Sequence, residues 1–104
     1  MNKDLLEKIE QVRESNTAQN IFTIASEELS ELSQVICKLK RLTNQDKTLR
    51  KEEQQIFEEL KEELSDVYLL LEQIKILGKI NDYEIERRIS EKIIRTFEKV
   101  GVYN

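Results

Sequence analysis

Proline, histidine and tryptophan are absent from this chain of 104 residues, and glycine and cysteine are scarce. The two glycines, Gly78 and Gly101, each follow a long periodic segment, so nothing interrupts a helix except near its end, which favours an all-α protein. Without histidine, a His-based catalytic dyad and a His-ligated zinc site are both excluded. The lone Cys37 has no partner for an internal disulfide, which indicates a reducing cytosol and predicts a cytoplasmic protein.

The chain also lacks long apolar runs and any concentration of positive charge. No run approaches the ~20 apolar residues of a membrane span, and the N-terminal MNKDLLEKIE reads as an amphipathic helix rather than a signal peptide. The net charge is −4 and the basic residues are not gathered in one tail, whereas proteins that bind a nucleic-acid backbone concentrate them. We therefore expect neither a membrane nor a nucleic acid as a partner.

Helical periodicity is the main positive signal, over a length that suits a single domain, residues 1–104. The spacing of apolar residues predicts four helices, at Lys3–Glu14, Thr17–Leu42, Arg50–Leu77 and Asn81–Val100. The segment 43–48 (TNQDKT) is expected to be a loop. The predicted helix ends carry three further signals: a capping box at Asn16 and Gln19, a cap at Asn81 with Glu84, and Gly78 as the residue after the third helix.

Acidic residues interrupt the apolar stripe of the second predicted helix, in SEELSELSQVICKLKR (26–41). At roughly 100° per residue with Glu28 at zero, Ile21 and Leu39 both fall at about 20°. Glu28 therefore lies within the apolar arc, and Glu31, at about 300°, lies on its edge. The third helix repeats this arrangement in EELKEELSDVYLLLEQI (58–74), with Glu63 in the arc and Asp66 on its edge.

Antiparallel packing of these two helices would bring both acidic pairs to one point, because residues three apart project side by side. Four carboxylates in a partly apolar setting repel one another strongly unless a cation lies between them. Oxygen ligands without histidine or cysteine favour Mg²⁺, with Mn²⁺ as a substitute. The predicted metal ligands are Glu28, Glu31, Glu63 and Asp66. The alternative is that these acids form a solvated face or ion pairs, since the chain has 21 acidic residues.

Basic residues flank the apolar face of the last predicted helix, at Arg88, Lys92, Arg95 and Lys99. On the second helix, Lys38 lies two turns after Glu31 on the same edge. Cations beside a magnesium site suit a polyphosphate substrate, whose charge the metal alone does not neutralise. The alternative is a solvated stripe, or one that pairs with glutamates of another helix.

The ordered acidic motifs resemble those of the MazG-like nucleoside triphosphate pyrophosphohydrolases, an all-α superfamily. Its pattern E-E-x-x-E, then E-x-x-D, reads here as EELSE (27–31) and ELSD (63–66), and EKIIR (91–95) matches a terminal K-x-x-R. The resemblance covers roughly residues 20–100, with a domain core at 17–100, and is strongest to short single-domain bacterial and phage members.

This resemblance implies a four-helix MazG-like bundle, completed by oligomerisation as a dimer or tetramer. It implies Mg²⁺ at the four acids and cleavage of a (deoxy)nucleoside triphosphate into the monophosphate and pyrophosphate. Glu28 or Glu31 would act on the attacking water as the catalytic carboxylate. The substrate phosphates would be contacted by Lys92, Arg95 and, more weakly, Lys38.

Two functions from different classes follow. The first is a Mg²⁺-dependent nucleotide pyrophosphohydrolase, favoured by the presence of all four acids. The second is a catalytically inactive MazG-like helical module for interaction or regulation, because no aromatic residue is clearly placed to stack a base beyond Phe22 and Tyr68. Self-association is expected in either case, since the apolar arcs are wider than one partner covers and Leu69 and Ile76 lie on the opposite face of the third helix.

Overall fold

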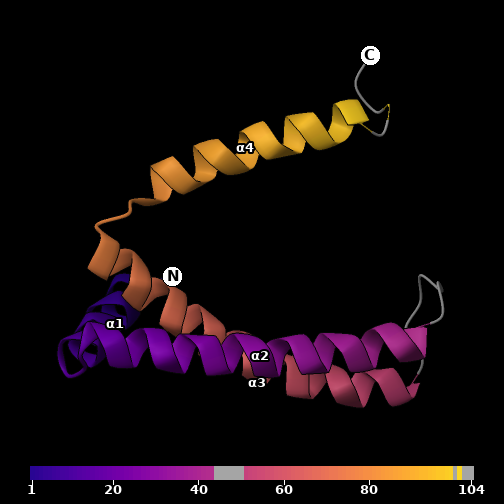
Figure 1. Ribbon diagram of the computed structural model, residues 1–104, viewed down its shortest axis with the longest axis horizontal. Coiled ribbons are helices and arrows are strands. Elements are labelled where there is room, and N and C mark those ends of the chain that lie inside the picture. The colour runs from indigo at the N-terminus through magenta and orange to yellow at the C-terminus, as the bar shows by residue number, and fades with distance from the viewer. Residues whose placement is uncertain (44–50, 100, 102–104) are drawn as a thin grey trace. The chain divides into compact units, whose positions relative to one another are not determined.

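The computed structural model describes residues 1–43, 51–99 and 101, and within them all regular structure is helical (Figure 1). This confirms the all-α prediction. The four helices are α1 (Lys3–Glu14), α2 (Ala18–Thr43), α3 (Lys51–Gly78) and α4 (Asp82–Lys99). Thr43, predicted to begin the loop at 43–48, belongs to α2 instead. The other residues of that predicted loop lie outside the described residues, and so does Val100, the predicted end of the last helix. None of the described helices combines the length and apolar character that a membrane span requires.

The start of α2 differs from the prediction by one residue. The capping box was expected at Asn16 and Gln19, but the side chain that caps the helix is Thr17, whose hydroxyl accepts a hydrogen bond from the Asn20 N–H at 3.1 Å. The Asn16 side-chain oxygen instead accepts a bond from Asn20 Nδ2 at 2.8 Å. The predicted cap was wrong because two capping residues are adjacent, and only the one at the turn itself reaches the first free N–H groups.

The turn between α3 and α4 confirms one prediction and corrects another. The predicted cap at Asn81 is present, because its side-chain oxygen accepts a bond from the Glu84 N–H at 2.9 Å. Gly78, predicted to follow α3, is instead its last residue, and Lys79 adopts the left-handed conformation at φ 52°. The N–H of Ile80 donates to the Lys75 carbonyl at 2.9 Å, which closes a Schellman motif. A Cβ added at Gly78 would lie 3.1 Å from Ile80 Cδ1, a tight approach that requires a small shift of that side chain.

The chain divides into two compact units, Met1–Ile74 and Lys75–Asn104, and a single domain over 1–104 stays a prediction. In the first unit α2 and α3 run side by side (Figure 1). They are antiparallel, because Lys38 of α2 pairs with Glu59 of α3 while Ile21 shares a cavity with Gln73. The core consists of short apolar side chains from the three helices, namely Ile9, Ile21, Ala25, Val35, Val67 and Leu70.

The predicted apolar stripe of α2 is buried along only one edge. Ile21 and Ala25 are buried, but Leu29 and Ile36 remain 48% and 51% exposed. With Phe22, which is 53% exposed, they form a line at seven-residue spacing on the outer side of the helix. Leu69, predicted to lie on the opposite face of α3, is 37% exposed, and it also lines a cavity that Val12 of α1 bounds. The exposed line Phe22, Leu29 and Ile36 is called the α2 stripe below.

Candidate metal centre

Three of the four predicted ligands lie close together, near the middle of α2 and the middle of α3. Glu28 and Glu31 are one turn apart on α2, and Glu63 comes from the antiparallel α3. One carboxylate oxygen from each of these residues lies within 4.8 Å of the other two. Asp66 is outside this group, although it lines a cavity beside Glu28. Tertiary packing therefore brings together an inner set of Glu28, Glu31 and Glu63, with Asp66 at its border.

The inner acids are set into the protein surface to different depths. Glu28 and Glu63 are half-buried, whereas Glu31 and Asp66 are exposed. One oxygen of Glu28 and one of Glu63, Oε2 in each case, is buried and has no hydrogen-bond partner. A buried carboxylate oxygen is costly to leave without a donor or a cation. The two unpartnered oxygens therefore suit a bound cation.

Among the described residues, no ion pair accounts for the acids of the cluster. The alternative interpretation requires lysines or arginines beside them, but in the described part of the chain none forms an ion pair with Glu28, Glu31, Glu63 or Asp66. The nearest bridge across the two helices joins Lys38 to Glu59 at 3.4 Å. Within the part of the chain that the structure describes, the acids of the cluster consequently face one another without a cationic side chain paired to them.

The cluster raises the pKa of two of its members above their ordinary value of 4.5. For Glu28 the largest cause of the raised pKa is removal from water, followed by the charges of Glu31, Asp66 and Glu63. For Glu63 it is again removal from water, followed by the charges of Glu31 and Asp66. Asp66 thus acts on both residues electrostatically although it lies outside the inner set.

These raised pKa values predict a pH dependence of the metal-free protein. Glu28 and Glu63 retain protons in the folded state at pH values where the unfolded chain has lost them. Their contribution to the free energy of unfolding is therefore fully present below the ordinary pKa of 4.5, and it is lost as the pH rises through the raised pKa values. Urea unfolding in a chelator, between about pH 4 and about pH 8, should show the double variant Glu28→Gln/Glu63→Gln gaining on wild type as pH rises. A difference that does not change with pH would contradict the raised pKa values.

The donor set fits a hard divalent cation. Ligand oxygens around an octahedral Mg²⁺ lie roughly 3 to 4 Å from one another, given bonds of about 2.1 Å. The spacing of the inner acids, within 4.8 Å, is reached from that arrangement by small side-chain rotations. The set is all oxygen, which favours Mg²⁺, Mn²⁺ or Ca²⁺ over zinc or copper. Glu28, Glu31 and Glu63 would hold the ion, and Asp66 is the nearest further carboxylate.

The predicted phosphate-binding residues lie in two places. Lys38 is on α2, about 10 Å along the helix axis from Glu31, and its ammonium group is engaged by Glu59. Lys92 and Arg95 belong to the second unit. With Thr96 and Lys99 they line a shallow depression on α4, whose volume is about 220 Å³. Their role as phosphate contacts stays a prediction.

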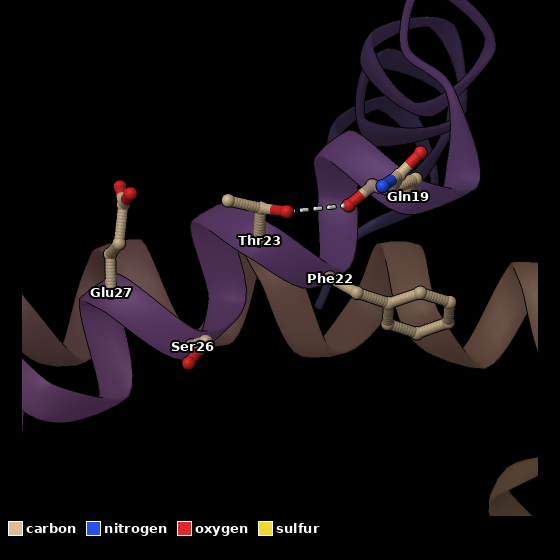
Figure 2. Close-up of a pocket in the computed structure, with 5 residues that line it drawn as sticks. All are labelled: Gln19, Phe22, Thr23, Ser26 and Glu27. Atoms are coloured by element: carbon tan, nitrogen blue, oxygen red, sulfur yellow. Dashed lines mark hydrogen bonds between the residues drawn. The ribbon is translucent and has the colours of Figure 1, made fainter.

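The outer face of α2 carries Glu27 and Phe22, two residues that the sequence motifs had singled out. Glu27, the first acid of the EELSE motif, is exposed (Figure 2). It borders a broad open surface with Gln19, Phe22, Thr23 and Ser26, and the only hydrogen bond drawn there joins the Thr23 hydroxyl to the Gln19 carbonyl at 2.9 Å. All five residues come from one helix, so the described residues do not enclose a ligand on this face. Phe22 and Tyr68, the possible base-stacking residues, are both exposed.

Sequence reasoning missed Gln73, which is 3% exposed and lines the cavity next to Glu28 and Asp66. A signal was available, because Gln73 follows Asp66 by seven residues and so lies on the same face of α3. Comparison of the chain with protein-family models, curated proteins and solved structures found no match.

Proposed function

We propose that this protein is a Mg²⁺-dependent nucleotide pyrophosphohydrolase of the MazG-like kind, acting in the cytosol. The observation that carries the proposal is the convergence of Glu28, Glu31 and Glu63, in which two buried carboxylate oxygens have no hydrogen-bond partner. Three carboxylates at this spacing, to which no lysine or arginine of the described residues is paired, suit a divalent cation that also binds phosphate oxygens. A nucleoside triphosphate supplies those oxygens.

The reaction is hydrolysis of the phosphoanhydride between the α- and β-phosphates. When bound, Mg²⁺ would offset the charge of the carboxylates and phosphates and make a water molecule more acidic. The water oxygen forms a new bond to phosphorus, the bridging P–O bond breaks, and pyrophosphate leaves the nucleoside monophosphate. Glu28 or Glu31 orients the water and accepts its proton. Glu31 is the exposed member of the inner set, so it is the one most open to a substrate water.

Basic residues are the proposed contacts to the substrate phosphates. Lys92 and Arg95 would contact the phosphates, where a guanidinium offers two parallel donors and an ammonium a compact charge. Lys38 would contribute after leaving Glu59, an exchange that costs little because both side chains of this ion pair are about half exposed.

Release of pyrophosphate from nucleoside triphosphates tests the function. We expect pyrophosphate and the nucleoside monophosphate, in equal amounts, from at least one member of a panel of ribo- and deoxyribonucleotides. The reaction should require Mg²⁺ or Mn²⁺ and stop in a chelator. Products should be separated by chromatography, because release of inorganic phosphate instead would place the cut at the β–γ bond. No product from any nucleotide would overturn the proposal in favour of a catalytically inactive helical interaction module.

The α2 stripe supports self-association as part of the same proposal. Phe22, Leu29 and Ile36 present a continuous apolar line on the first unit, and each is about half exposed. A line at seven-residue spacing is the pattern that pairs helices along a common seam. We therefore propose that a second copy of the chain covers it, giving a dimer or a pair of dimers.

Light scattering coupled to size-exclusion chromatography checks the assembly. Wild type at micromolar concentration is expected at twice or four times the mass of one chain, 12.4 kDa. Leu29→Glu should shift the measured mass toward that of a single chain, because burial of an unpaired carboxylate between two apolar helices is strongly unfavourable. Gln34→Glu, an equal charge change at an exposed position off the stripe, is the control and should not shift it. Wild type that elutes and scatters as a single active chain would refute the assembly.

A further inference from the structure

A cavity of about 180 Å³, lined by residues of the first unit, borders the acidic cluster. Glu28, a member of the inner set, lines it, and so does Asp66 at the border of that set. Neither the open surface on the outer face of α2 nor the depression on α4 includes any of the four predicted metal ligands. This cavity, unlike those two surfaces, is therefore continuous with the candidate metal centre.

The cavity has buried apolar walls and an apolar rim that is left in water. Ile21 of α2 and Leu70 of α3 are buried walls. Val12 of α1 and Leu69 of α3 also line the cavity, but they remain 42% and 37% exposed. Large apolar side chains that stay in water around an apolar recess are typical of a ligand site. Because the two rim residues come from different helices, a flat ligand that enters the cavity would remove both from water.

The nucleoside of a nucleotide held at the acids must lie on the surface beside them. If Mg²⁺ on the carboxylates binds the phosphates, the sugar follows at once, because a single ester bond joins it to the α-phosphate. The base is then placed against the protein next to the acids, where this cavity lies. A base has two flat apolar faces and a polar edge, which suits aliphatic walls that include two amides, Asn16 and Gln73. Since the cavity opens to solvent, it has room for a base of either ring size.

We propose that this cavity holds the nucleoside end of the substrate and that α1 forms one of its walls. The inference rests on the nucleotide pyrophosphohydrolase proposed above, and it adds where the nucleoside binds and which residues contact it. Val12 and Leu69 contact the base, while the phosphates extend toward Glu28. Helix α1 lies outside the stretch that carries the MazG-like resemblance, roughly residues 20–100, so the role of Val12 is inferred from the packing of α1 and not from that resemblance.

Narrowing the cavity at its rim tests the assignment. Val12→Phe adds a ring at a position that is 42% exposed, where the fold tolerates it, and should lower kcat/KM for nucleoside triphosphates by about 10-fold or more. Leu5→Phe is the matched control, because Leu5 is on the same helix, is 43% exposed and does not line the cavity; it should leave kcat/KM nearly unchanged. Both variants should keep the Mg²⁺-induced rise in melting temperature, since neither residue is a metal ligand. An unchanged kcat/KM in Val12→Phe would overturn the nucleoside pocket and leave the pyrophosphohydrolase intact.

Binding to wild type is measured independently of turnover, through the methyl NMR signals of Val12 and Leu69. The probes are nucleoside 5′-monophosphates of adenine, guanine, cytosine, uracil and thymine, each at millimolar concentration with Mg²⁺. At least one of them should shift the signals of both residues and leave those of Leu5 in place. Ribose 5-phosphate, which carries the phosphate without a base, should shift neither residue.

The outcomes of this titration separate the pocket from the reaction. Selective shifts without hydrolysis of any nucleoside triphosphate would keep the nucleoside pocket and remove the proposed reaction. Absence of shifts with every monophosphate, or equal shifts with ribose 5-phosphate, would refute the pocket whether or not the protein releases pyrophosphate.

Discussion

Replacing Glu63 with glutamine is expected to abolish pyrophosphate release while making the metal-free protein more stable. The change removes a charge from a group whose pKa is raised by removal from water and by the charges of Glu31 and Asp66. It therefore relieves repulsion at neutral pH in the absence of a cation. It also removes a metal ligand, so the loss of turnover should exceed about 100-fold, since even residues that only support a ligand cost about 10- to 100-fold.

Two further substitutions make this result specific. Glu62→Gln removes the same charge from the neighbouring exposed residue and should leave both turnover and the melting temperature of the metal-free protein nearly unchanged. Glu28→Gln should reproduce the Glu63→Gln result, because Glu28 also has a raised pKa and a buried, unpartnered oxygen. Thermal melts in a chelator and assays in Mg²⁺ measure the two effects separately. A metal-free Glu63→Gln protein that melts below wild type would mean that the carboxylate is stabilised by a cationic side chain.

Adding Mg²⁺ or Mn²⁺ to wild type is expected to raise its melting temperature substantially at neutral pH. An ion that binds only the folded state stabilises it by about 2.7 kcal/mol when its concentration is 100 times the dissociation constant. For a chain of this size that stabilisation corresponds to a shift of roughly 10 °C. The shift should shrink toward acid pH, because protons compete for the same carboxylates whose pKa values are raised.

The acid variants again supply the control for metal binding. Glu28→Gln and Glu63→Gln should lose most of the Mg²⁺-induced shift, and Asp66→Asn should lose less, because Asp66 lies outside the inner set of three. Na⁺ at equal ionic strength should not reproduce the effect, which separates binding from general screening of charge. An unchanged midpoint at millimolar Mg²⁺, together with no heat of binding in calorimetry, would count against a metal centre.

The helices, and the helix faces on which their acidic residues lie, could be predicted directly from the sequence. The predicted span Lys3–Glu14 agrees with α1, and Asn81 caps α4 through Glu84 as expected. These features depend on contacts between residues three or four apart, which the order of residues specifies directly. For the same reason, the positions of Glu28 and Glu63 within apolar arcs followed from helical periodicity alone. The errors at this level were shifts of one residue, at Thr17 and at Lys79, where neighbouring residues compete for one terminal position.

Which acids actually meet, and what lies beside them, was decided by the tertiary structure. Sliding one helix by a single residue moves a side chain by about 1.5 Å along the axis and by about 100° around it, and helical periodicity does not specify that register. The packing of α2 on α3 draws Glu31 into the inner set and leaves Asp66 at its border, although the two occupy equivalent places on their helices. The same packing, together with α1, encloses the cavity and buries Gln73 in it. The sequence by itself thus determined the helices and the acids on their faces, whereas the grouping of the acids and the neighbouring cavity required three helices, distant in sequence, to come together.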